Sequence, residues 1–106
     1  MDGRSMVATT DTIERAIVRL TTAELMLGDL PEIAVEWESL AEGERAAWSI
    51  DWDNEMAGLE QLSRLAACGE LTPDLYSRYR HVLGAINEAA PILNRLNLSP
   101  PLFHNR

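Results

Sequence analysis

The seven residues CGELTPD, at positions 68–74, mark the clearest structural boundary in this chain of 106 residues. Gly69 is the residue type that most often follows the last turn of a helix, because glycine adopts a left-handed conformation at little cost. Thr72 offers a capping hydroxyl, and both Pro73 and Asp74 are favoured in the first turn of a helix. Because the connection is only about four residues long, we expect the two flanking helices to fold back antiparallel.

Apolar residues recur every three or four positions on both sides of this boundary, as in amphipathic helices. The helix before it is predicted over residues 40–68, with a stripe formed by Trp48, Trp52, Met56, Leu59, Leu62 and Ala66. The helix after it is predicted over residues 73–96, with a stripe formed by Leu75, Tyr79, Val82, Leu83, Ile86, Ala90 and Leu93. Pro91 should kink this helix, because proline lacks a backbone donor and crowds the preceding turn. Antiparallel pairing would place Leu59 near Val82 and Trp48 near Leu93.

An earlier helix is predicted over residues 11–27. Thr10 or Asp11 can cap its start, and the pair Gly28-Asp29 is typical of a helix end. Pro31 then suits the first position of a second, short helix.

Residues 31–68 have two interpretations, and both stay open. Ser39 and Glu42 have the spacing of a capping box, which predicts that a helix restarts there. Trp37, Trp48 and Leu59 are spaced by eleven residues, which instead fits one unbroken helix.

The predicted fold class is therefore all-α: an antiparallel helical hairpin completed into a three- or four-helix bundle. Residues 11–98 are expected to form a single helical bundle domain. Residues 1–10 are expected to be a disordered lead-in or the remnant of a cloning tag, and residues 99–106 an extended tail. No segment shows the strict alternation of a strand.

The charge is unevenly distributed along the chain. The formal net charge is −8, and residues 31–70 alone contain ten acids against two arginines. An acidic surface repels phosphates and anionic lipid headgroups, which argues against nucleic-acid and membrane partners and permits a basic protein partner. We find no apolar run long enough to cross a bilayer and no signal peptide. The single cysteine, Cys68, cannot form an intrachain disulfide, so we expect a cytoplasmic protein with this thiol partly buried.

Acidic residues on the apolar stripes are the most informative polar feature. Glu55 falls inside the stripe of the helix over residues 40–68, Glu44 and Asp51 lie on its edge, and Glu24 falls inside the stripe of the first helix. A carboxylate in such a place is costly unless it is paired. Three explanations are open: a salt bridge within the bundle, an arginine supplied by a partner, or a carboxylate site for a metal or for catalysis. The internal arginines considered are Arg15, Arg19, Arg78 and Arg80.

The tryptophans at helical spacing are core residues in the simplest interpretation, but tryptophan is also enriched in binding hot spots. We therefore predict that a basic or apolar protein partner binds here. The predicted contact residues are Trp37, Glu44, Trp48, Asp51, Trp52 and Glu55. A separate self-association seam for a homodimer is predicted at Val18, Leu25 and Met26, on the outer side of the first helix.

Motifs for enzymatic chemistry are absent. The sequence has no glycine-rich phosphate loop, nucleophile elbow or zinc-protease helix. The acidic stretch at residues 51–55 lacks the glycine and spacing of a calcium loop. The segment at residues 76–81 mixes tyrosines and arginines. We expect Tyr79 in the core, with Arg78 and Arg80 beside it and meeting the acidic helix over residues 40–68; the alternative is stacking with phosphate contact. We assign no catalytic, cofactor-binding or metal-binding residues.

The predicted function is a small acidic protein-interaction module, an adaptor or regulatory subunit, that acts by protein–protein contact and can form a homodimer. One alternative is an acidic inhibitor that imitates nucleic acid and binds a basic protein. Another, from a different class, is a carboxylate-dependent metal enzyme.

Overall fold

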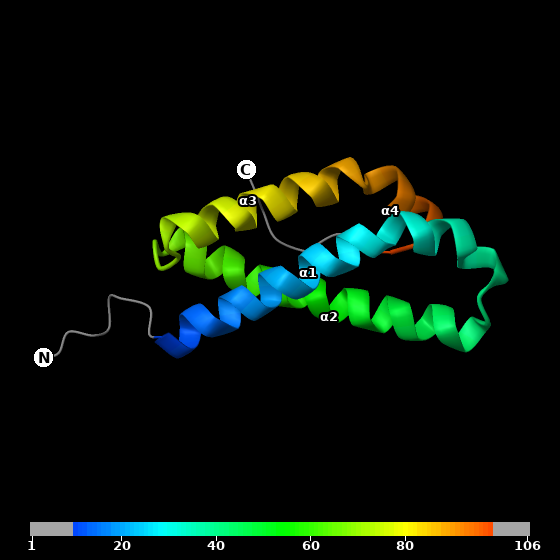
Figure 1. Ribbon diagram of the computed structural model, residues 1–106, viewed down its shortest axis with the longest axis horizontal. Coiled ribbons are helices and arrows are strands. Elements are labelled where there is room, and N and C mark those ends of the chain that lie inside the picture. The colour runs from blue at the N-terminus through cyan, green and yellow to red at the C-terminus, as the bar shows by residue number, and fades with distance from the viewer. Residues whose placement is uncertain (1–9, 99–106) are drawn as a thin grey trace, which may run out of the picture.

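The computed structural model describes residues 10–98 (Figure 1). Its elements are α1 (Thr10–Glu36), the short 3₁₀ helix η2 (Trp37–Ser39), α2 (Glu42–Ala67), α3 (Pro73–Glu88) and α4 (Ala90–Leu96). The all-α prediction is confirmed, since this part of the chain contains helices and no strand. The predicted lead-in and tail lie outside the described residues, except for Thr10, which begins α1.

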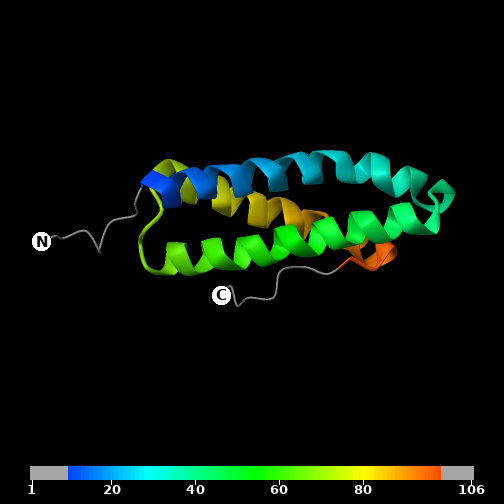
Figure 2. The same ribbon diagram turned by 90° about the horizontal axis from the view of Figure 1, so that it is seen from below.

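The molecule is elongated and measures 57 × 26 × 20 Å. The helices α1, α2 and α3 run along its length (Figures 1 and 2). The backbone of α1 comes close to both α2 and α3, whereas α2 and α3 do not approach each other to a similar extent. The predicted hairpin, with its two apolar stripes in direct contact and Trp48 near Leu93, is therefore not confirmed.

Side-chain size explains why α1 lies close to both α2 and α3. Its buried positions include three alanines, Ala16, Ala23 and Ala34, which let neighbouring helices come close. In contrast, α2 and α3 bury large side chains such as Trp52 and Tyr79, which hold their backbones apart while still joining the same core.

The predicted end of the first helix at Gly28-Asp29 is wrong. The helix α1 continues through Pro31 to Glu36, so Pro31 is an interior residue and not the start of a second helix. Leu30 and Ala34 are buried on the face that continues from Leu20. We infer that burial of this face outweighs the hydrogen bond that a proline in the helix interior loses.

Residues 31–68 are two helices, so the unbroken-helix interpretation is wrong and the predicted restart is correct. After η2, Leu40 and Ala41 are extended, with ψ angles of 146° and 153°. The capping residues differ from the prediction: the Ser39 hydroxyl donates to the Glu36 carbonyl (2.8 Å), and the Glu44 carboxylate accepts from the Ala41 amide (2.9 Å). Glu44, a predicted contact residue, thus helps to start α2.

Two arginines cover the exposed carbonyls where α1 and η2 end. Arg95 of α4 donates to the Ala34 carbonyl (2.8 Å), and Arg45 of α2 donates to the Trp37 carbonyl (3.2 Å). The Trp37 carbonyl also accepts from the Leu40 amide (3.3 Å). Cations at the end of a helix complement the negative end of its dipole.

The boundary at residues 68–74 is confirmed. Gly69 has a φ of 72°, and the Glu70 amide donates to the Leu65 carbonyl (2.9 Å), as in a glycine-terminated helix. The Thr72 hydroxyl accepts from the Leu75 amide (3.2 Å), as in a capped helix start. The predicted disruption by Pro91 is also confirmed, because the helix breaks at Ala89 and α4 restarts with Pro91 in its first turn.

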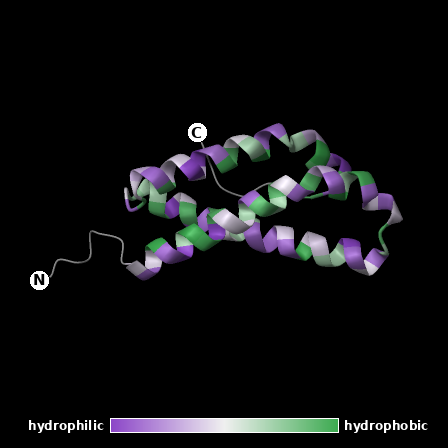
Figure 3. Cartoon of the chain, viewed as in Figure 1, coloured by the Kyte–Doolittle hydropathy of each residue, from purple (hydrophilic) through white to green (hydrophobic). Residues whose placement is uncertain are grey.

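Hydrophilic and hydrophobic residues alternate along each helix (Figure 3). Accordingly, no helix among the described residues combines the length and apolar character needed to cross a membrane.

Replacing Thr72 by alanine should destabilise the protein by about 1 kcal/mol, because the Leu75 amide loses its capping oxygen. Urea unfolding followed by far-UV circular dichroism measures this difference. Thr72→Ser keeps a hydroxyl and should stay close to the wild-type value, and an equal loss in both variants would contradict the capping role.

Candidate functional site

The predicted tryptophan contacts separate into core and edge residues. Trp52 is fully buried and stacks on Trp48, with ring centroids 5.8 Å apart and an interplanar angle of 13°. Trp52 therefore belongs to the core and, unlike the other predicted contact residues, presents no surface to a partner. Trp37 and Trp48 are half-buried and pack against the same core, so each still presents an edge to the surface.

Glu55 lies on α2 where that helix faces α1. Its Oε1 atom is buried and has no hydrogen-bond partner among the described residues. Burial raises the pKa of Glu55 above its usual value; the positive charge of Arg19 acts in the opposite direction, and the negative charge of Asp51 adds to the rise. Glu55 therefore does not form the predicted internal salt bridge; Arg19 attracts it electrostatically without a direct contact.

Glu24 has the internal partner that was predicted. Arg78 of α3 donates two hydrogen bonds to the Glu24 carboxylate, at 2.7 and 3.1 Å, and a third to the Thr21 hydroxyl at 3.2 Å. The hydrogen bond to Glu24 raises the pKa of Arg78. This polar clamp joins α1 and α3, so both charges are already paired within the molecule.

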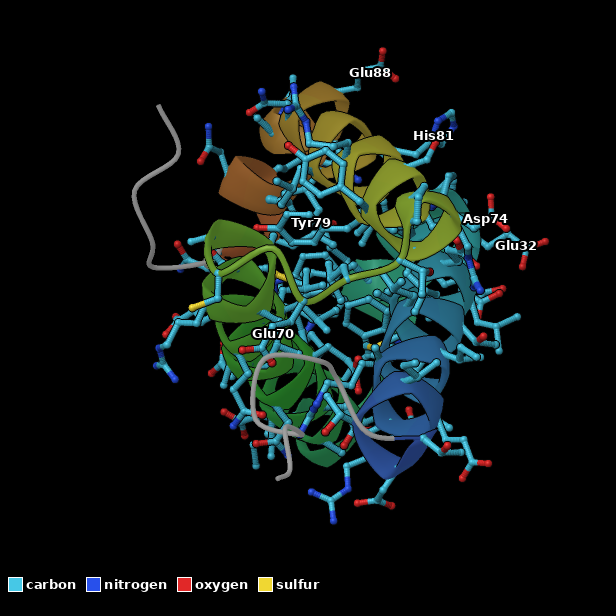
Figure 4. The ribbon with its side chains drawn as sticks, turned by 90° about the vertical axis from the view of Figure 1, so that its left-hand side faces the viewer. Glu32, Glu70, Asp74, Tyr79, His81 and Glu88 are labelled. Carbon is cyan, nitrogen blue, oxygen red and sulfur yellow. The ribbon has the colours of Figure 1, made fainter. Side chains whose placement is uncertain are left out.

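The aromatic and basic segment of α3 is explained by packing. Tyr79 is buried and points into the space between the helices, whereas His81 points outward (Figure 4). Arg80 donates to the Tyr76 hydroxyl (3.1 Å) on the surface of the same helix. Arg78 meets α1 instead of the acidic α2. Cys68 is exposed, so the expectation of a partly buried thiol is wrong.

The predicted dimer seam is small. Val18 and Leu25 are 63% and 65% exposed, but Met26 packs against the core and does not extend the seam. Two side chains are far less than the roughly 800 Å² that each partner buries in a typical stable interface. Homodimerisation through α1 therefore stays a prediction that needs additional contacts.

An acidic end is the most pronounced surface feature, and we define it by eight exposed carboxylates on the last part of α1, on η2 and on the first half of α2. They are Asp29, Glu32, Glu36, Glu38, Glu42, Glu44, Asp51 and Asp53. None of the eight has an ion pair within the described part of the chain. Two arginines that contact this end of the molecule, Arg45 and Arg95, donate to backbone carbonyls. The sequence showed the excess of acids, but not that the local arginines are used elsewhere.

Within residues 10–98, no group of three or more histidine, cysteine, aspartate or glutamate side chains has the geometry to hold a metal ion. Comparison with known proteins finds no match to a family model, a curated protein or a solved structure. The surface itself is thus the basis for any functional proposal.

A double-mutant cycle on Glu24 and Arg78 should give a coupling of about 0.5–1 kcal/mol, the usual range for a well-aligned pair that is open to solvent. The variants are Glu24→Gln, Arg78→Gln and both together, compared by urea unfolding at low and high salt. High salt should reduce the coupling. A coupling near zero at low salt would show that the clamp does not hold α1 to α3.

Replacing Glu55 by glutamine should stabilise the protein near neutral pH, by less than about 1 kcal/mol because part of the side chain is solvated. Since burial raises the folded-state pKa, the protonated form stabilises the fold at low pH, and this contribution is lost as the pH rises through that pKa. The advantage of Glu55→Gln should therefore shrink as the pH falls through the raised folded-state pKa, and it should vanish below the ordinary value of 4.5.

Glu88→Gln is the matched control for this experiment, because it removes one exposed charge on α3 (Figure 4). Urea unfolding over a series of pH values compares the two variants with the wild type. A pH profile that is the same for both variants would contradict the effect of burial at Glu55.

Proposed function

We propose that this chain is a protein-interaction module, an adaptor or regulatory subunit, that binds a basic segment of another protein through its acidic end. The eight exposed carboxylates without an ion pair are the observation that carries this proposal. Because none of the eight is paired with a described arginine, a cationic partner would relieve their mutual repulsion and also speed association.

Exposed apolar side chains support a partner that is apolar as well as basic. Val35 on α1 is 85% exposed and Ile50 on α2 is 60% exposed, and both lie on the helix segments that carry the acidic end. The half-buried edges of Trp37 and Trp48 lie on the same segments. Apolar anchors surrounded by charged residues are the usual composition of a transient protein interface.

A rigid frame is part of the proposal. We infer that α2 and α3 act as an antiparallel hairpin, closed at Gly69 and completed into a bundle by α1. The arginines on the Ala34 and Trp37 carbonyls would hold the acidic end of this frame together. A preorganised surface loses less entropy on binding than a flexible one.

Imitation of nucleic acid is a weaker second candidate, because it needs the acids on one continuous face. Glu44 and Asp51 are seven residues apart, so they share one side of α2. Glu42 and Asp53, eleven residues apart, share another side of that helix. The acids thus surround the helix instead of forming a phosphate-like row. No described feature favours the metal-enzyme alternative.

The test compares two triple variants that remove the same number of charges. Glu36→Gln, Glu38→Gln and Glu42→Gln neutralise the acidic end, whereas Glu14→Gln, Asp74→Asn and Glu88→Gln neutralise exposed acids elsewhere. Proteins retained by the wild type from the native host are identified, purified and titrated against all three forms by calorimetry.

The acidic-end variant should bind the purified partner about tenfold more weakly at low salt, and this difference should narrow at high salt. The control variant should bind like the wild type. Equal weakening by both triple variants would show that binding depends on net charge and not on the acidic end, which would contradict the proposal. Unchanged binding by the acidic-end variant would also overturn it.

A further inference from the structure

Two adjoining hollows lie along the boundary between α1 and α2, away from the acidic end. Their volumes are about 390 and 440 Å³, within the range of small-molecule sites. Arg15 and Arg19 line both hollows, Arg64 lines the smaller one, and Glu55 lines the larger one. Three arginines therefore gather around one hollow in a protein whose net charge is −8.

The side chain of Arg19 occupies the space that a side chain at position 58 of α2 would fill. Its guanidinium lies over Gly58, where an added Cβ would collide with it. Arg19 is half-buried, yet its guanidinium makes no hydrogen bond or close ion pair with the described residues. A guanidinium has five donors, so this one is positioned and still open for an acceptor.

The smaller hollow combines this positive rim with an apolar floor. Ala16 and Leu62 form buried parts of the lining, and Leu65 is a half-buried part. Arg64 is exposed and has no ion pair within the described part of the chain, whereas Arg15 is paired with Asp11 at 2.9 Å. Two arginines, Arg19 and Arg64, thus remain for an anion above an apolar surface.

We propose that the smaller hollow is a binding site for a small organic anion, a monocarboxylate with a short apolar body. The carboxylate would accept hydrogen bonds from Arg19, with Arg64 adding positive charge, because a guanidinium matches the two oxygens of a carboxylate. The hydrocarbon part would cover the exposed part of Leu65, beneath which Ala16 and Leu62 are buried. This site is separate from the acidic end and does not depend on the function proposed there.

Nuclear magnetic resonance titration with hexanoate, hexanamide and acetate tests the proposal. Hexanoate should shift amide resonances of α1 and α2 around the hollow in a saturable way. Hexanamide, which lacks the charge, and acetate, which lacks the apolar body, should bind at least about tenfold more weakly. From butanoate to hexanoate, each methylene that reaches the floor should tighten binding about three- to fourfold.

Two variants separate the position of Arg19 from its charge. Arg19→Gln removes the charge, and Gly58→Ala keeps it but forces the guanidinium aside. Both should weaken hexanoate binding about tenfold or more, since a bidentate charged contact is lost. Gly84→Ala on α3, where an added Cβ meets open space, and Arg80→Gln should bind like the wild type. Circular dichroism checks the fold of each variant. If Gly58→Ala does not fold, the result for Arg19→Gln alone tests the proposal.

Equal binding of hexanoate and acetate would indicate an adventitious anion only and would overturn the proposal. Binding of hexanamide as tight as that of hexanoate, or wild-type binding by Arg19→Gln, would also overturn it. A saturable response to an acidic peptide without any response to hexanoate would assign the hollow to a protein partner instead.

Discussion

The close approach of α1 to both of its neighbours is the constraint on which the rest of the structure depends. Alanines at the buried positions of α1 and the glycine at position 58 of α2 leave room for this approach. Each edge of α1 then carries one polar arrangement: the Glu24–Arg78 clamp faces α3, and Arg19 lies across α2. A larger residue at the buried alanines would separate the backbones, and one at Gly58 would displace the Arg19 guanidinium.

Local signals in the sequence predicted local structure well. The glycine end at Gly69, the threonine cap at Thr72 and the break before Pro91 each depend on residues within a few positions of one another, and the structure has all three. The extent of α1 could not be read in the same way. Pro31 is a strong breaker by local rules, and only the burial of Leu30 and Ala34 in the folded molecule explains why the helix continues.

The candidate site was predicted only in part, for a related reason. A helical wheel places a residue on a stripe, but it does not show whether a neighbouring helix covers that part of the stripe. Trp52 and Trp48 share a stripe, yet only Trp52 is fully enclosed. Likewise, Glu24 and Glu55 both fall inside apolar stripes, but Glu24 has an arginine in bonding reach and Glu55 has a buried oxygen without a partner.

The exposed thiol of Cys68, at the end of α2, has a practical consequence for measuring the size of this molecule. Under oxidising conditions, two copies can join covalently through this one position, and the chain has no second cysteine to compete for it. A doubled mass in air-exposed samples would then be caused by a disulfide cross-link and not by association through the outer face of α1. Sizing the particle in the presence of a reductant distinguishes the two causes.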